Sequence, residues 1–161
     1  MVKQCMMPGY CQRAAQLLLD HQGVVLIGTG FPVHGTFETD GPIGAISLYK
    51  VLEHLGYTPV LVCTPPLADA VAPNFRTHPV PVLPWNESIL VMQAALQQWQ
   101  PALIISIEQP GVAQDGRYYS MRKRDITDLS PKGDLLLQYA DCPTIGIGDG
   151  GNEIGMGNVL P

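Results

Sequence analysis

The sequence predicts an α/β protein built on a doubly wound, mostly parallel sheet of about five strands with helices on both faces. Two observations support this fold class. Short apolar runs rich in β-branched residues recur along the chain, as expected of strands that are covered on both faces. Segments of helical period separate these runs, and such regular alternation of strand and helix is typical of a parallel sheet.

The individual elements follow from the apolar runs and the residues that bound them. Helices are expected at residues 11–21, 41–55, 87–98 and about 131–140. Strands are expected at residues 24–27, 60–63, 103–107 and 144–147, with a short one at 80–83. Thr39 or Asp40 suits the N-cap of the second helix, and Asn86 or Ser88 suits that of the third. A long loop is expected over residues 108–130.

The length of 161 residues fits a single α/β domain over residues 1–161. Residues 152–157 are expected to open a further helix, with only four residues after it. Because so short a helix covers little of the sheet edge, the domain is expected to be C-terminally incomplete. An apolar face left open in this way predicts association into a homo-oligomer.

Composition and charge exclude several classes of partner. Charged residues make up only 14% of the chain, against roughly 25% in a typical soluble domain. The net charge is −5, and basic residues form no run longer than residues 122–124. A binder of nucleic acid or of an anionic membrane needs a basic patch, so neither partner is expected. No apolar run approaches the roughly 18 residues of a membrane span.

The N-terminal segment and the cysteines indicate the cellular compartment in which the protein is expected. Residues 1–10 lack a basic segment followed by a long apolar one, so no signal peptide is expected. The four cysteines are Cys5, Cys11, Cys63 and Cys142, and none forms a CxxC pair. They are expected to be reduced structural residues of an intracellular protein. The protein is therefore expected in the cytoplasm, or in an organelle matrix if a transit peptide has been removed.

Three polar, glycine-containing clusters follow three of the expected strands. They occupy residues 28–42, 108–119 and 148–153. In an open α/β sheet the carboxyl ends of the strands face one crevice, where ligands bind. The three clusters are therefore expected to converge there, although they lie far apart in the sequence.

The clusters carry groups suited to proton transfer and to binding of charged ligands. Their acidic residues are Glu38, Asp40, Glu108, Asp115, Asp149 and Glu153. Thr29 adds a hydroxyl donor, Arg117 a guanidinium for a carboxylate, and His34 lies within the first cluster. Plainer roles also stay open, with residues 28–30 as a tight turn and Asp40 as a helix cap. The glycine pattern matches neither GxxxxGK[ST] nor GxGxxG, so no nucleotide cofactor is expected.

Taken together, three motifs resemble one known family. They are TGFP with ETDGP at residues 29–32 and 38–42, DGRYY at 115–119, and GIGDGGNEIGMG at 146–157. In order and spacing they resemble the D-glutamate cyclase C-terminal domain family, formerly a domain of unknown function. The resemblance runs from about residue 14 to the end, and family members continue with a further helix. It implies a lyase that converts D-glutamate to 5-oxo-D-proline and water by attack of the amine on the γ-carboxyl.

The resemblance also implies roles for particular residues. Asp149 or Glu153 takes the ammonium proton, and Glu38 or Asp40 protonates the γ-carboxyl. Alternatively Asp149, Glu153 and Asp40 hold a divalent metal ion, Mg or Mn, at the γ-carboxyl. Residues expected to bind the small amino-acid substrate are Thr29, Gly30, Asp115, Arg117, Gly150, Gly151 and Asn152.

Two other interpretations remain open from the sequence. Residues 148–153 are similar to the metal-binding GDGxND of haloacid-dehalogenase-like, magnesium-dependent phosphatases, and residues 38–42 faintly resemble their DxDGT motif. Glu38, however, stands where those enzymes carry the nucleophilic Asp. The third interpretation is non-catalytic, either an inactive truncated fragment or a small-molecule binding module.

Overall fold

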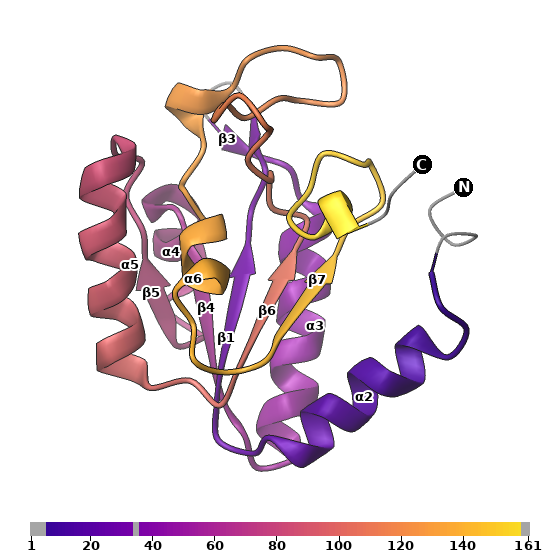
Figure 1. The fold of residues 1–161 in the computed structure, drawn as a ribbon. Coiled ribbons are helices and arrows are strands. Elements are labelled where there is room, and N and C mark those ends of the chain that lie inside the picture. The colour runs from indigo at the N-terminus through magenta and orange to yellow at the C-terminus, as the bar shows by residue number, and fades with distance from the viewer. Residues whose placement is uncertain (1–5, 34–35, 159–161) are drawn as a thin grey trace.

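A five-stranded parallel sheet lies at the centre of the computed structural model, which describes residues 6–33 and 36–158 (Figure 1). The strand order is β5-β4-β1-β6-β7. The strands are β1 Val24–Thr29, β4 Thr58–Cys63, β5 Thr77–Pro79, β6 Leu103–Ile107 and β7 Thr144–Ile147. The predicted fold class is therefore confirmed.

Helices cover both faces of the sheet. They are α2 Tyr10–Asp20, α3 Asp40–His54, α4 Pro65–Val71, α5 Trp85–Trp99 and α6 Asp134–Gln138. Val25 and Ile27 of β1 are fully buried in one cluster with Tyr49 of α3. Leu26 points the other way, into a cluster with Met92 of α5 and Leu135 of α6. This alternation along one strand makes β1 the central, doubly covered strand of a doubly wound sheet.

The direction of winding reverses between β1 and β6. From β1 the chain passes through α3 to β4 and β5, and it returns through α5 to β6 on the other side of β1. Such a switch point opens a crevice at the carboxyl ends of the two neighbouring strands. In Figure 1 the loops that follow β1, β6 and β7 gather at this end of the sheet.

Several elements depart from the sequence-based boundaries. The short strand lies at Thr77–Pro79 rather than 80–83, because Pro81 has no N–H to donate to a ladder. The fourth helix is only Asp134–Gln138, since Pro131 and Gly133 shorten its start. Residues 152–155 open no helix, and a 3-10 helix follows at Met156–Asn158.

The helix caps also differ from the sequence-based expectation, and the structure contains a helix and a small hairpin that were not expected. Thr39 is the N-cap of α3 but its side chain makes no capping bond, and Pro84 rather than Asn86 or Ser88 precedes α5. Helix α4 was not expected because residues 64–66 resemble a turn. A small hairpin, β2 Pro32–Val33 with β3 Thr36–Phe37, follows β1. His34 and Cys5 lie outside the described residues.

The exposed surface carries apolar side chains on α3 and on the edge strand. Ile43, Val51 and Leu55 on or beside α3 are more than half exposed, and Ile147 of β7 is 46% exposed. Association of two copies through these residues stays a prediction. Within the described residues, no helix is both long and apolar enough to cross a membrane. Cys11, Cys63 and Cys142 are free thiols, and Cys63 is the buried one of these three.

A buried tyrosine anchors the loop that precedes α6. The Tyr118 side chain is fully buried, and its hydroxyl donates to Asp134 Oδ2 at 2.6 Å. Burial raises the pKa of both groups, and the N–H of Val112 donates to the other oxygen of Asp134. This contact ties the loop to the first turn of α6.

We expect Tyr118→Phe to lower the free energy of unfolding by about 1–3 kcal/mol, because it leaves a buried carboxylate oxygen without its donor. Chemical denaturation measures the change. The matched control is Tyr119→Phe, which removes a similar bond to Asp115 at an exposed position. A loss of less than about 0.5 kcal/mol in Tyr118→Phe would show that this bond does not hold the loop.

Candidate active site

The crevice begins at the neighbouring ends of β1 and β6. Thr29 is the last residue of β1 and pairs with Ile107, the last residue of β6. Glu108 follows directly in the left-handed conformation, with φ of 50°, and its N–H donates to Ile147 O of β7. A non-glycine residue in this region is uncommon and marks a position that its surroundings hold firmly. The turn places the Glu108 side chain against Gly41 at the start of α3.

The segment after β7 folds back onto the segment after β6. The N–H of Gly111 donates to Asn152 O, and that of Ile154 donates to Gln109 O, each at 2.9 Å. This short antiparallel pairing, centred on Pro110 and Glu153, brings the third motif beside Glu108. We call residues 109–111 and 152–154 the clamp.

Glycines make the room that the clamp needs. A Cβ on Gly111 would lie 2.9 Å from the backbone C and O of Glu153. A Cβ on Gly146 would lie 2.8 Å from the backbone O of Ile154, and one on Gly148 would lie 2.8 Å from the Glu153 Cβ. The glycine-rich composition of the third motif therefore serves close backbone approach.

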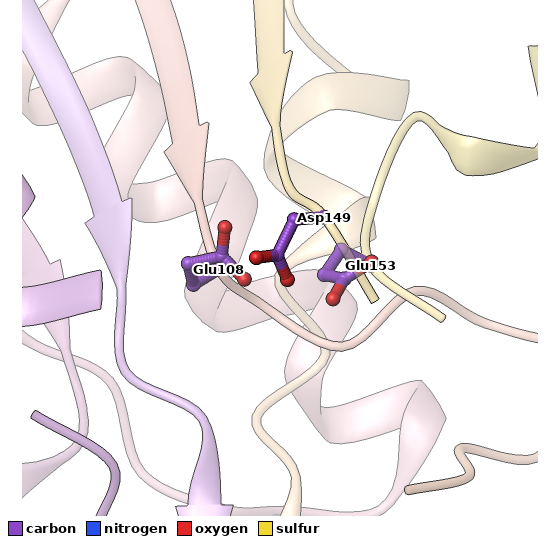
Figure 2. Close-up of side chains that lie close together, drawn as sticks. All are labelled: Glu108, Asp149 and Glu153. Atoms are coloured by element: carbon purple, nitrogen blue, oxygen red, sulfur yellow. The ribbon is translucent and has the colours of Figure 1, made fainter. Parts of the chain in front are cut away.

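Three carboxylates converge at this point. One oxygen each from Glu108, Asp149 and Glu153 lies within 4.8 Å of the others. Figure 2 shows Asp149 between the two glutamates. Glu153 is buried, Glu108 is half-buried and Asp149 is exposed, so the group opens to solvent at Asp149.

The three carboxylates differ in what already holds them. Glu153 Oε1 accepts the N–H of Gly150, and its Oε2 accepts those of Gly151 and Asn152 at 2.7 and 3.1 Å. The Glu153 side chain therefore stabilises the loop of residues 150–152 that precedes it. Among the described residues, the hydrogen bonds include none to the carboxylates of Glu108 or Asp149. These two side chains remain available to a ligand.

The electrostatics of the group are dominated by negative charge. Partial burial, followed by the charges of Glu153, Asp149, Asp40 and Glu38 in that order, raises the pKa of Glu108 to about 7. These four charged groups, all among the described residues, are acidic. A site of this kind favours a bound cation or a shared proton.

The residues expected from the first cluster lie at the same crevice. Asp40 begins α3 and accepts the N–H of Gly41 at 2.9 Å, and Glu38 lies just before it. Both are exposed and act on Glu108 through their charge. Thr29 ends β1, and Gly30 follows it with φ of 104°. The structure therefore brings Thr29, Glu38 and Asp40 to the edge where the third motif lies.

The residues expected from the second cluster form a separate network in the loop. Arg117 Nη1 pairs with Asp125 Oδ2 at 2.8 Å, with both side chains largely exposed. Asp115 accepts the hydroxyl of Tyr119 and the N–H of Arg117. In the part of the chain that the structure describes, the hydrogen bonds and ion pairs of Asp115 and Arg117 include none to the three carboxylates. The link to the site is indirect, through Asn152 Nδ2, which donates to Tyr119 O at 2.8 Å.

Two buried oxygens at the crevice lack hydrogen-bond partners. Thr29 Oγ1 belongs to a side chain that is only 2% exposed, and it faces Gly41, which the Glu108 Cβ also contacts. Asn152 Oδ1 faces Gly150 beside Glu153 Oε1. An unpaired buried group costs about 1–3 kcal/mol, and such groups in native proteins have a functional or solvent explanation.

Glu108 is the site residue to which sequence reasoning gave no definite role. It was one of several acidic candidates, while Asp115 and Arg117 were preferred from the same cluster. The available signal was its position, since it directly follows the longest expected strand, residues 103–107. In an open α/β sheet the first residue after a strand lies at the crevice, whereas residues further along the loop need not.

Two cavities in the described part of the chain lie away from the three carboxylates. One of about 510 Å³ is at the amino ends of β6 and β7, and its lining includes Gln100 and Asp141. A second, of about 230 Å³, lies beside Gly30 and is lined by Phe31, Phe37 and other mostly apolar residues. The carboxylate group is open to solvent at the exposed Asp149.

Fold and site together define a doubly wound α/β protein with an acidic site at the switch point of its sheet. The family model described as "D-glutamate cyclase-like, C-terminal" matches residues 1–161, and the chain belongs to this family. The chain is also 36% identical over 168 residues to the human protein named "D-glutamate cyclase, mitochondrial". That alignment covers 90% of this chain but 27% of the human protein, so the chain spans about a quarter of its relative.

Proposed function

We propose that this chain is a D-glutamate cyclase-like lyase that converts D-glutamate to 5-oxo-D-proline and water. The observation that carries the proposal is the convergence of Glu108, Asp149 and Glu153 at the switch-point crevice of a chain that belongs to this family. The name of the human relative supplies the substrate.

The reaction is balanced without a further reactant. The amine nitrogen attacks the γ-carboxyl carbon, a C–N bond forms, and one C–O bond breaks. The ammonium nitrogen has three hydrogens and the ring nitrogen keeps one, so two protons move to the departing oxygen and leave as water. The site must therefore remove protons from nitrogen and return them to oxygen. Carboxylates placed within hydrogen-bond reach suit both tasks.

We assign the first proton transfer to Asp149. Its carboxylate is exposed beside Glu108 and is not committed to the loop, whereas Glu153 is bound to three backbone N–H groups. Glu153 is accordingly a positioning residue, which differs from the alternative catalytic role expected from the sequence. Glu38 and Asp40, on the α3 side of the crevice, return a proton to the departing oxygen. Backbone N–H groups near Gly30 stabilise the oxyanion, since those of Gly150, Gly151 and Asn152 are already donated to Glu153.

The test is to incubate the purified chain with D-glutamate and to measure 5-oxoproline by chiral chromatography. We expect 5-oxo-D-proline from D-glutamate and much less product from L-glutamate, since closure requires one hand of the amine to face Asp149. A folded chain that forms no product, while a longer form of the protein does, would place part of the site outside this chain. Failure of both would contradict the proposed activity.

A phosphatase function finds less support. Phosphatases with a DxDGT motif carry their nucleophile directly at a strand end, but the end of β1 holds Thr29 and Gly30. For the compartment, the name of the human relative favours an organelle matrix over the cytoplasm. Cell fractionation tests that assignment.

A further inference from the structure

The tip of the loop between β6 and α6 carries three consecutive cations, Arg122, Lys123 and Arg124. The chain has 9 Lys and Arg residues in all, so three of the nine lie in this one turn. All three residues are exposed. Among the described residues, the ion pairs include none to any of these three cations. We call residues 122–124 the basic turn.

Two contacts hold the basic turn beside the third motif. Asn152 Nδ2 donates to Tyr119 O at 2.8 Å, just before the turn. Met121 Sδ lies 3.1 Å from the point at which a Cβ on Gly150 would lie. Figure 1 shows the loop between β6 and α6 at the same end of the sheet as the segment after β7. Because Gly150 directly follows the exposed Asp149, the basic turn lies at the solvent-open side of the acidic group.

The loop fixes the shape of the turn and leaves its charges unpaired. The N–H of Ser120 donates to Arg124 O, and that of Lys123 donates to Ser120 O. Lys123 is in the left-handed conformation, with φ of 57°, which marks a position that its surroundings determine. Asp125 directly follows the turn, but its carboxylate pairs with Arg117 Nη1 at 2.8 Å. The nearest acid in the sequence is therefore already paired, and the basic turn remains available to a ligand.

We propose that the basic turn binds the α-carboxylate of the substrate while the amine and the γ-carboxyl lie at the acidic group. The step rests on the proposed function. D-glutamate carries two carboxylates, which the carboxylates of Glu108, Asp149 and Glu153 repel. Cations beside these three residues supply the missing attraction, and an arginine binds a carboxylate through charge-assisted, often bidentate hydrogen bonds. Arg117, expected from the sequence to make this contact, is instead part of the loop that presents the turn.

Binding of the α-carboxylate also explains a preference for one hand of glutamate. The α-carbon carries the amine, the α-carboxylate and the side chain that ends in the γ-carboxyl. With only the amine and the γ-carboxyl held, the α-carbon can present either hand and still direct its amine to Asp149. A third contact, at the basic turn, removes this freedom. The turn is therefore expected to determine specificity as well as affinity.

The triple variant Arg122→Gln, Lys123→Gln, Arg124→Gln tests the proposal. We expect the KM for D-glutamate to rise by about tenfold or more, the usual effect of losing a charge-assisted hydrogen bond. The kcat should change by less than about threefold, because the α-carboxylate is bound equally before and during ring closure. The preference for D- over L-glutamate should fall, which a merely structural role of the turn would not cause.

The three single variants identify which cation makes the contact, and Lys50→Gln is their matched control. Lys50 is an exposed cation on α3, ten residues after Asp40 and thus about 15 Å along the helix from the crevice. Its replacement removes one positive charge and should leave both KM and the preference for D-glutamate unchanged. Far-ultraviolet circular dichroism confirms that each variant is folded.

A titration with glutarate measures binding without turnover, because this dicarboxylate lacks the amine that closes the ring. Calorimetry on the wild type and the triple variant, at low and high ionic strength, gives the two affinities. We expect the triple variant to bind glutarate about tenfold more weakly or worse. Salt should weaken binding to the wild type more than binding to the variant, because it screens the exposed cations of the turn.

The outcomes separate this proposal from the proposed activity. In a chain that forms 5-oxoproline, an unchanged KM in the triple variant would overturn the role of the basic turn and leave the activity intact. In a chain that forms none, the glutarate titration decides. Equal affinity in both proteins, or no binding by the wild type, would then overturn the role of the turn, whereas weaker binding by the variant would support it and contradict only the activity.

Discussion

Asp149→Asn is expected to reduce formation of 5-oxo-D-proline by about 10²- to 10⁴-fold, the range that removal of an acid–base group usually costs. The amide has the size of the carboxylate but cannot accept a proton from the ammonium group. Asp149 is exposed, so the free energy of unfolding should change by no more than about 0.5 kcal/mol. Product formation by chromatography and a denaturation curve on the same sample measure the two effects.

Asp141→Asn is the matched control for activity, because it removes an exposed negative charge at the far end of the sheet. It should retain wild-type turnover. Near-normal turnover in Asp149→Asn would remove Asp149 from the mechanism and leave Glu108 as the carboxylate of the group not bound to the loop. A variant that has lost its fold as well as its activity would instead assign Asp149 a structural role, contrary to its exposure.

The sequence predicted that the three polar clusters converge at one edge of the sheet, and it left open which of their side chains meet there. Strand–helix alternation gave the parallel sheet, and strands of such a sheet end at one edge, so clusters after β1, β6 and β7 had to meet there. The order of the strands in the sheet could not be predicted from the sequence, because the hydrophobic pattern of a strand does not indicate which strands are its neighbours. The position of Glu108 beside Asp149 depends on that order, since β6 lies between β1 and β7.

The sequence could not show which carboxylate binds its own loop and which remains free to bind a ligand. Asp149 and Glu153 both occur in one glycine-rich motif and looked equivalent. Whether a carboxylate turns into its own loop or out toward a ligand depends on the backbone path of that loop. Here Gly150 and Gly151 present their N–H groups to Glu153, which commits it to the loop. In the same way, the sequence suggested that Arg117 could bind a substrate carboxylate. The fold of its loop instead pairs Arg117 Nη1 with Asp125 Oδ2 at 2.8 Å.

The clamp makes Gly111, a residue without a functional side chain, important for the site. We expect Gly111→Ala to lower the free energy of unfolding by about 1–3 kcal/mol, the usual range for overpacking. Its Cβ would meet the backbone C and O of Glu153 at 2.9 Å, and a backbone cannot yield as a side-chain tip does. The residues 152–154 must then move away, and Glu153 moves with them relative to Glu108.

The same displacement should lower turnover of D-glutamate by about tenfold or more, since a shift of 1 Å at reacting groups can cost about 10²-fold. Gly44→Ala is the matched control. It adds a methyl group to α3 with its nearest contact at 3.8 Å, so stability should stay equal or rise by up to about 1 kcal/mol. If Gly111→Ala matched Gly44→Ala in both stability and turnover, the clamp would not be what positions Glu153. A loss of turnover larger than the loss of stability explains would identify Gly111 as a positioning residue, because a purely structural role lowers activity only as far as it lowers the folded fraction.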